Sequence, residues 1–430
     1  MIEPATNPVN NSPSNGTKMQ WVSALSTRAS LEAALDEAIA LAQQGLSAQP
    51  DLGLIFISSA FASEYSRVMP LLQEKLSLKA LLGCSGGGIV GVNTEGQARE
   101  LEGKPAISLT LACLPGVEVK AFHLNAETLP DLDGPPNAWT DLIGIPTQQT
   151  PHFILLSDPF SSKINDLLQG LDFAYPGSVK VGGLASSGSA MGNRTGLFAN
   201  YEFYQEGTVG LALSGNVVME AIVAQGCRPI GQPLRVTEGE RNIVLGLEDV
   251  ETNLSDFGQQ SRTPLEVLRS ILEELSEEDR TLAQNSLFVG IARNEFKQDL
   301  EQGDFLIRNL LGVDPRVGAI AVGDRVRSGQ RIQFHLRDAR TSAEDLELLM
   351  KRYQMEETQK TSSAVGALMF SCLGRGESLY NKPNFDAELF SRYTKQIPIS
   401  GFFCNGEIGP VGGGTFLHGY TSVFGICRQP

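Results

Sequence analysis

Short apolar runs that end in a small polar residue recur along the chain. Each run is followed by an amphipathic stretch and then by a second apolar run. The first runs lie at residues 54–61, 153–160 and 367–372. Apolar runs of this length between turn residues are typical of buried strands, and a helix between two such strands indicates a parallel pair. The repeat therefore predicts three βαβ units.

The second run of each unit leads into a glycine-rich turn. Both strands of a βαβ unit end at the same edge of their sheet, where open α/β sheets bind ligands in crevices. We therefore predict a ligand-binding site built from these turns and strand ends. The predicted ligand-binding residues are Cys84, Ser85, Gly86, Ser186, Ser187, Cys372, Arg375, Asn405, Gly406 and Glu407.

Further strand-like runs follow the first two units. Residues 106–114 with 117–123, and 208–213 with 217–225, are joined by Pro-Gly and Ser-Gly turns. Such turns predict that each pair forms an antiparallel hairpin that extends its sheet. The expected fold class is therefore mixed α/β, or α+β, with repeated β-α-β-plus-hairpin units forming two domains with mixed sheets.

The composition of the chain changes after residue 250, where a polar stretch is followed by two segments with a helical pattern. We place a boundary there, between an N-terminal domain over 20–250 with two repeats and a C-terminal domain over 251–430. Residues 1–19 are rich in Asn, Pro, Ser and Thr, without the positive and apolar regions of a signal peptide. This segment is predicted to be a disordered tail.

Charge narrows the range of partners. The chain has 49 acidic and 34 basic residues, a formal net charge of −15, and no stripe of Lys and Arg. Such a surface repels nucleic acid and anionic membranes. No window approaches the roughly 18–20 consecutive apolar residues of a membrane helix. We expect a cytoplasmic protein that binds neither nucleic acid nor membrane.

Cysteine and histidine spacing predicts neither a metal site nor a cofactor. The six cysteines form no CxxC pair and have no His neighbour at metal-ligand spacing. In a cytosolic protein such cysteines are expected to be free thiols. The cysteines are Cys84, Cys113, Cys227, Cys372, Cys404 and Cys427.

The first and third turns carry the candidate chemistry. The glycines of residues 83–91 could cradle an anion with backbone N–H groups, or could simply allow a sharp turn. Glu407 next to a buried strand end needs a partner, and Arg375 on the neighbouring turn is the natural one. The two side chains either form an internal salt bridge or meet the ammonium and carboxylate of an amino-acid ligand.

Cys372 ends a predicted strand, a place where a nucleophile can be presented. A nearby arginine would lower the pKa of its thiol. No His is placed beside it by the repeat, which argues against catalysis. Cys404 closes the paired strand, so the two thiols are candidates for a redox switch, and simple packing of both side chains is the remaining alternative.

Four stretches together resemble the FIST family, with its N-terminal and C-terminal domains in tandem. They are residues 83–91, 182–186, 210–215 leading to 224–231, and 374–376 with 401–409, and the likeness covers about 20–428. The resemblance implies a role in signal transduction, in which FIST domains sense small ligands such as amino acids. Some bacterial members bind haem, but none of the four histidines here lies in a haem-type motif, which disfavours a haem-based gas sensor.

The expected function is therefore sensing of a small ligand, an amino acid or similar zwitterion. The sequence contains no kinase, methyl-accepting or F-box region, so we expect the signal to pass through an unidentified partner protein. The alternatives are a ligand-independent adaptor and a thiol-dependent enzyme or redox sensor that uses Cys372. We do not expect a dedicated enzyme.

Overall fold

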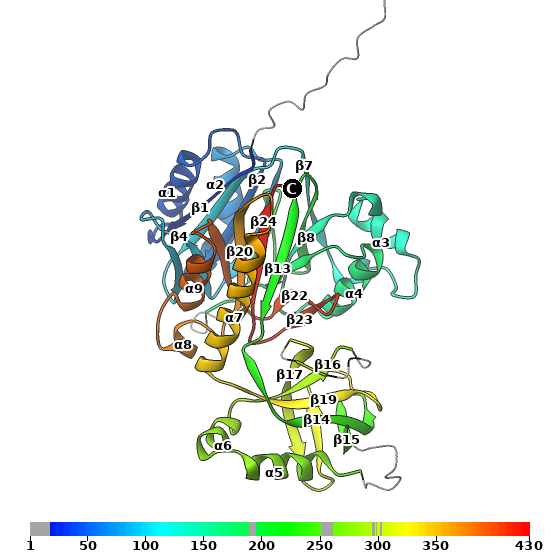
Figure 1. The fold of residues 1–430 in the computed structure, drawn as a ribbon. Helices are drawn as coiled ribbons and strands as arrows, with labels where there is room; N and C mark the ends of the chain where they lie inside the picture. Colours follow the sequence, from blue (N-terminus) through cyan, green and yellow to red (C-terminus); the bar gives the residue numbers. More distant parts are fainter. Residues whose placement is uncertain (1–17, 189–194, 251–260, 295–296, 298, 302) are drawn as a thin grey trace, which may run out of the picture.

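The computed structural model describes residues 18–188, 195–250, 261–294, 297, 299–301 and 303–430. These residues form a body of three six-stranded sheets and a smaller closed barrel (Figure 1). The sheets mix parallel and antiparallel strands and are covered by helices, so the predicted fold class is confirmed. Most of the predicted tail lies outside the described residues, and Met19 is buried against the core.

The body consists of three units with the same order of elements. The first comprises β1 (Gln20–Ser26), α1 (Leu31–Gln44), β2 (Leu52–Ser58), α2 (Tyr65–Lys75), β3 (Ala80–Gly86), β4 (Gly88–Val92), β5 (Ala98–Glu102) and β6 (Ile107–Cys113). The second comprises β7 (Val117–Leu124), α3 (Pro136–Ile143), β8 (His152–Ser157), α4 (Ile164–Ala174), β9 (Lys180–Leu184), β10 (Leu197–Ala199), β11 (Glu202–Tyr204) and β12 (Thr208–Gly215).

The third unit has the same order but is interrupted after its first strand by the barrel. It comprises β13 (Val218–Ala224), α7 (Ala339–Glu357), β20 (Ala364–Cys372), α8 (Glu377–Tyr380), α9 (Phe385–Tyr393), β21 (Ile399–Cys404), β22 (Glu407–Val411), β23 (Gly414–His418) and β24 (Ser422–Arg428). The pairs β2–β3, β8–β9 and β20–β21 are parallel. All three predicted crossover units are therefore confirmed.

A glycine recurs at the same place in the second strand of each parallel pair. A Cβ atom added to Gly83, Gly182 or Gly401 would lie 2.1, 1.8 or 1.8 Å from a carbonyl oxygen of the neighbouring strand. No side chain fits at that distance, so close approach of the two backbones requires glycine there.

The two hairpins predicted from the sequence are wrong. β6 pairs with β1 and β2, whereas β7 pairs with β12 in another sheet. β12 and β13 are separated in the same way, because β13 pairs with β24. Each Pro-Gly or Ser-Gly turn does reverse the chain, but the chain then crosses into the next sheet instead of pairing with itself.

The hairpins that do form are exchanged between units. β4–β5, β10–β11 and β22–β23 each follow the crossover strand of their own unit. Each then pairs with the crossover strand of a different unit: β4 with β21, β10 with β3, and β22 with β9. The three sheets are therefore linked in a ring.

The three sheets share one apolar core and carry their helices on the outside. Phe56, Leu156 and Phe370 occupy equivalent positions in the central strands, and all three lie in this core. The Phe56 ring stacks on Phe402 at 5.3 Å and meets Phe370 edge-on at 6.4 Å. Alternate residues of the same strands pack under the helices in separate clusters. This alternation explains why the strands read as continuous apolar runs.

The barrel has its own apolar core and contains strands from both sides of residue 250. Its elements are β14 (Cys227–Glu240), β15 (Ile243–Asp249), α5 (Pro264–Glu274), α6 (Glu277–Ala283), β16 (Leu287–Ala292), β17 (Phe305–Asp314), β18 (Ala319–Val322) and β19 (Arg331–Arg337). Residue 250 thus falls within the span of the barrel, not between the barrel and the body. The chain enters at Cys227 and leaves at Arg337, which are register partners.

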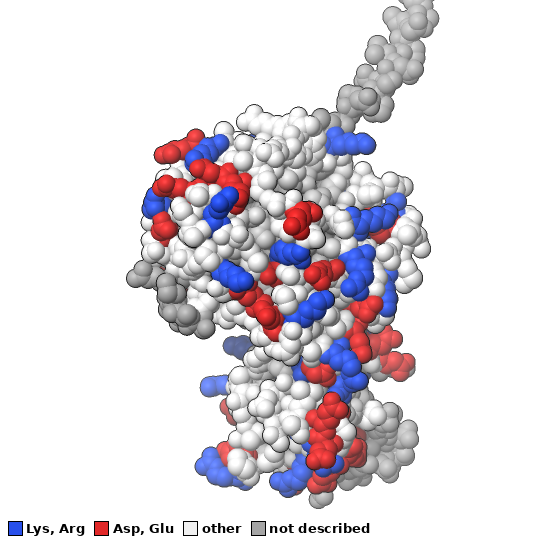
Figure 2. Space-filling model, turned by 90° about the vertical axis from the view of Figure 1, so that its left-hand side faces the viewer, with Lys and Arg blue, Asp and Glu red and all other residues white. Residues whose placement is uncertain are grey.

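Charged side chains of both signs are interspersed on the face shown in Figure 2. The molecule narrows between the body and the barrel in this view. Across the described ranges, no helix combines the length and apolar character that crossing a membrane requires.

Candidate functional site

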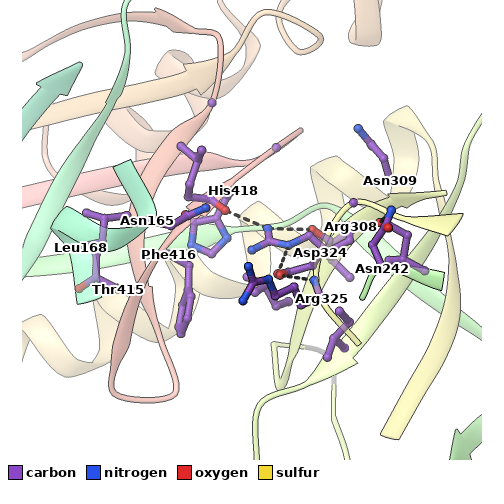
Figure 3. A pocket seen from close by; sticks show the side chains of 18 of the residues that line it. Asn165, Leu168, Asn242, Arg308, Asn309, Asp324, Arg325, Thr415, Phe416 and His418 are labelled. Carbon is purple, nitrogen blue, oxygen red and sulfur yellow. Dashed lines mark hydrogen bonds and ion pairs between the residues drawn. The ribbon is translucent and has the colours of Figure 1, made fainter. Parts of the chain in front are cut away.

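A cleft of about 1710 Å³ runs between the body and the barrel. One wall comes from β17, β18 and the neighbouring turns of the barrel, and the other from α4 and the β22–β23 hairpin (Figure 3). The hairpin turns at Gly412 and Gly413, whose φ angles are +59° and +87°. Two consecutive residues with positive φ make the tight reversal that places β23 along the cleft.

In the first two units, the serine that ends the first strand of the parallel pair is engaged in hydrogen bonds within the body. Ser58 Oγ accepts a hydrogen bond from the Ala106 N–H at 3.0 Å. Ser157 Oγ accepts a hydrogen bond from Thr208 Oγ1 at 2.9 Å. In the third unit, Cys372 and Leu373 line the cleft instead. The end of β20 in the third unit is therefore the open strand end, because it faces the cleft.

The three glycine-rich turns lie together, and Ser186 joins them. Its Oγ accepts a hydrogen bond from Gly87 N–H at 2.8 Å and donates one to the Phe403 carbonyl. Ser85 Oγ donates to the Ser186 carbonyl at 3.1 Å. The turns thus meet through their own hydrogen bonds, which occupy much of the space between them.

The cleft includes three of the predicted ligand-binding residues, Cys372, Asn405 and Gly406. Ser187 is half-buried beside Gly87. The other predicted residues are buried, and among the described residues they are not part of the cleft lining. They are Cys84, Ser85, Gly86, Ser186, Arg375 and Glu407.

Arg375 pairs with Asp386 of α9, not with Glu407 as the sequence suggested. Its Nε lies 2.7 Å from Asp386 Oδ2 and its Nη2 lies 3.1 Å from Oδ1. Nη2 also donates to the Tyr380 hydroxyl at 2.6 Å. The crossover through α8 and α9 brings these partners under the turn, which the spacing of the two turns alone did not indicate. Nη1 has no hydrogen-bond partner within the described part of the chain.

Glu407 is fully buried at the first position of β22. Its Oε2 accepts hydrogen bonds from Thr421 N–H at 3.0 Å and Thr421 Oγ1 at 2.8 Å. Its Oε1 is buried without a partner among the residues that the structure describes. Burial raises the pKa of Glu407 to about 8, so the carboxyl group is mostly protonated at neutral pH. A protonated acid can remain inside without a salt bridge.

Cys372 and Cys404 are register partners on parallel strands, as the repeat implied. Burial raises the pKa of the Cys372 thiol to about 11, and burial also raises the pKa of Cys404. The lowered pKa that we expected for Cys372 is therefore wrong, because desolvation outweighs the effect of the nearest arginine. Both thiols are protonated at neutral pH, which makes them weak nucleophiles.

The barrel wall contributes arginines that we did not predict as site residues. Arg308 Nε lies 2.8 Å from Asp324 Oδ2, and its Nη1 donates to the Leu417 carbonyl of the body at 2.8 Å. The Arg293 guanidinium lies 3.8 Å above the centre of the Phe416 ring. Both contacts cross from barrel to body. A density of arginines over 293–327 in a chain of net charge −15 was the available signal.

His418 closes the body side of the cleft. Its Nε2 lies 3.0 Å from the Gly409 carbonyl oxygen, and burial lowers its pKa to about 4. The ring is therefore neutral at physiological pH. In the described ranges no three His, Cys, Asp or Glu side chains group together in a way that could hold a metal ion.

Comparison with known proteins assigns both halves of the chain. A model of the FIST N domain matches residues 51–249, and a model of the FIST C domain matches residues 264–410. An uncharacterised protein of Mycobacterium tuberculosis is 34% identical over 405 residues, which cover 94% of this chain and 98% of the relative. An uncharacterised protein of Mycobacterium bovis is 32% identical over 379 residues, covering 88% and 90%.

A more distant relative matches only part of this chain. F-box only protein 22 of Pongo abelii is 30% identical over 105 residues, which cover 24% of this chain and 25% of that protein. The two domain matches together span most of the chain, in the order that the glycine-rich stretches suggested. The chain belongs to the FIST family, with a FIST N and a FIST C domain in tandem.

Proposed function

We propose that this protein senses a small molecule, which binds in the cleft between the body and the barrel. FIST domains are sensory domains of signal-transduction proteins and are not catalytic domains. The observation that carries the proposal is the cleft itself, which lies where one open strand end faces a separately folded barrel.

The position of the cleft supports a mechanism for signalling. The barrel is tied to the body by two chain crossings next to the register pair Cys227 and Arg337. The barrel also touches the body through Arg293 on the Phe416 ring, Arg308 on the Leu417 carbonyl and Phe288 on the Tyr420 ring, and a movement of the barrel would rearrange these contacts. A ligand that touches both walls favours one position of the barrel, and so shifts the population of conformations.

The chemistry of the walls supports an amino acid or similar small zwitterion as ligand. Arg293 and Arg325 on the barrel side can receive a carboxylate, and Asp166 on α4 can receive an ammonium group. Asn405 and the backbone of Gly406 add neutral polar contacts. Arg375 and Glu407 are buried behind this surface and would reach a ligand only after local rearrangement.

We further propose that a partner protein in the cytoplasm reads the position of the barrel. The similarity to part of F-box only protein 22 supports this route, because the shared segment occurs there within a different protein. A thiol-dependent enzyme is disfavoured, because burial keeps Cys372 protonated.

A melting scan against a metabolite library tests the proposal. A ligand at about 100 times its Kd adds roughly 2.7 kcal/mol to the free energy of unfolding. Asn405→Trp should obstruct the cleft at the open strand end and reduce the shift, whereas Asn137→Trp on exposed α3 should keep it. Mass spectrometry of molecules released from gently purified protein identifies a ligand that the library lacks.

The adaptor alternative makes the opposite prediction. If no compound moves the melting temperature and no small molecule is released, the cleft does not sense a ligand. A partner that binds equally well to the wild type and to Asn405→Trp, without any added compound, would then establish a ligand-independent adaptor.

A further inference from the structure

The charges that line the cleft do not cancel. Five arginines and three aspartates line it, namely Arg241, Arg293, Arg308, Arg325, Arg327, Asp166, Asp172 and Asp324. Asp324 is paired with Arg308, and Asp172 is paired with Lys180 at 2.9 Å. Within the described ranges the other four arginines and Asp166 form no ion pair. Four unneutralised cations therefore face one unneutralised acid, in a chain whose net charge is −15.

Two of the cations are held near one another. Arg293 is fixed over the Phe416 ring, and Arg308 is fixed by Asp324 and by the Leu417 carbonyl. Burial lowers the pKa of Arg293, and the charge of Arg308 lowers it further against the opposing effect of Asp324. Two guanidinium groups near a single carboxylate that pairs with only one of them repel each other, and an added anion relieves that repulsion.

The same carboxylate also sets the turn that carries a third arginine. The backbone N–H of Arg325 donates to Asp324 Oδ1 at 2.7 Å. The labelled side chains of Arg308, Asp324 and Arg325 lie together on the barrel side in Figure 3, with Asn165 and His418 on the body side. The cationic wall is thus partly organised before any ligand arrives, which reduces the cost of binding.

The opposite wall contains the N-terminus of α4, an eleven-residue helix. Ser162 and Asn165, at the start of this helix, line the cleft. The N-cap residue is Lys163, which makes no side-chain capping hydrogen bond. An uncapped helix N-terminus carries a partial positive charge and free N–H donors. Asp166 in the same turn offsets part of this charge and remains available for an ammonium group.

We infer that the ligand of this cleft is a small molecule with at least two anionic groups, held between the barrel arginines and the first turn of α4. This inference rests on the proposed function and specifies the ligand class of the same site. Carboxylates and phosphates share the required chemistry. A dicarboxylic amino acid would also use Asp166, whereas a phosphate ester would rely on the arginines and the helix N-terminus.

Isothermal titration of the full chain with matched compounds tests the inference. Glutamate is compared with its neutral isostere glutamine, and succinate and glycerol phosphate represent dianions without an amino group. At least one dianion should bind ten times more tightly than glutamine, and its affinity should fall as salt is added. A preference for glutamate over succinate indicates the amino-acid source, and a preference for glycerol phosphate indicates the phosphate source.

Two variants test the residues that carry the inference. Arg293→Gln and Arg325→Gln should each weaken the dianion at least tenfold. Arg316→Gln removes an arginine that is 86% exposed elsewhere on the barrel and should leave binding unchanged. Because Arg293 packs on Phe416, the melting temperature without ligand is recorded for each variant, and the exposed Arg325 gives a second result if Arg293→Gln unfolds.

The outcomes separate this inference from the proposed function. If none of glutamate, succinate and glycerol phosphate binds more tightly than glutamine, or if Arg325→Gln binds the dianion as tightly as the wild type does, the dianion inference is overturned while a sensory cleft remains. Release of a neutral or cationic molecule from purified protein, with no dianion binding, has the same consequence. If no compound binds and none is released, both proposals are wrong.

Discussion

At the scale of single residues, burial keeps Glu407 protonated in the folded chain at a pH at which the unfolded chain has lost this proton. The group has a pKa of about 8 in the folded chain, against 4.5 when exposed. Between these values the folded state holds a proton that the unfolded state has lost. The contribution of Glu407 to stability therefore decreases as the pH rises from about 4.5 to 8 and is constant outside that window.

Glu407→Gln should remove this dependence, because glutamine keeps the shape of the protonated acid without titrating. Relative to the wild type, the variant should gain roughly 3–4 kcal/mol in free energy of unfolding between pH 5 and pH 8. Urea unfolding at several pH values measures the difference. Glu127→Gln, a change of an exposed acid, should leave the profile unchanged. A constant difference between Glu407→Gln and the wild type would show that Glu407 does not hold the proton.

Ser186 and Ser187 are adjacent in the chain but differ in burial and in hydrogen bonding. Ser186→Ala removes the acceptor for the part-buried Gly87 N–H and the donor to the buried Phe403 carbonyl, leaving both backbone groups without this partner. We expect a loss of about 1–3 kcal/mol in free energy of unfolding. Ser187→Ala, at a half-buried position, should cost less than about 0.5 kcal/mol. Similar costs for the two variants in chemical denaturation would contradict the joining role of Ser186.

At the scale of elements, the crossover strands depend on their recurring glycine. Gly401→Ala would place a Cβ 1.8 Å from the Met369 carbonyl oxygen and force the parallel pair apart. The expected loss is about 3 kcal/mol or more in free energy of unfolding. Gly312 of β17 also lies in a strand, but no atom lies within 4 Å of its added Cβ. Gly312→Ala should therefore be nearly neutral, and equal effects in thermal unfolding would count against the explanation.

The sequence predicts strands and crossover helices well because both leave a local pattern. The runs at 153–160 and 367–372 give β8 and β20, and the amphipathic stretch near residue 390 gives α9. Sheet membership leaves no such pattern. The turn between β6 and β7 looks like any hairpin turn, and only packing of the three sheets around Phe56 and its equivalents sends β7 elsewhere.

The residues of the candidate site could be predicted from the sequence only where they belong to the repeated βαβ unit. Cys372, Asn405 and Gly406 follow from the position of a strand end and its turn. The facing arginines lie on a barrel that has no counterpart in the other two units, so the repeat could not place them. Arg293 comes beside the site through pairing of distant strands, which a local pattern does not record.

At the scale of the whole molecule, the body should fold without the barrel. Because Cys227 and Arg337 are register partners, a short Gly-Ser linker can replace residues 227–337. The shortened chain keeps all three body sheets and should unfold in one cooperative transition, measured by circular dichroism. A fragment over 18–250 lacks β21, β22 and β24, the partners of β4, β9 and β13, and should remain unfolded or aggregate. Independent folding of that fragment would contradict this description.

The exchange of hairpins between units also bears on the order in which the protein can be completed during synthesis. The first sheet receives its last strands at residues 197–204, well before the strands that complete the other two sheets. The second sheet waits for β22–β23 and the third for β24, which are synthesised long after the first sheet is complete. Until these strands are made, two sheets have unpaired edges, and a nascent chain stalled before residue 407 would be exposed to aggregation or to capture by chaperones.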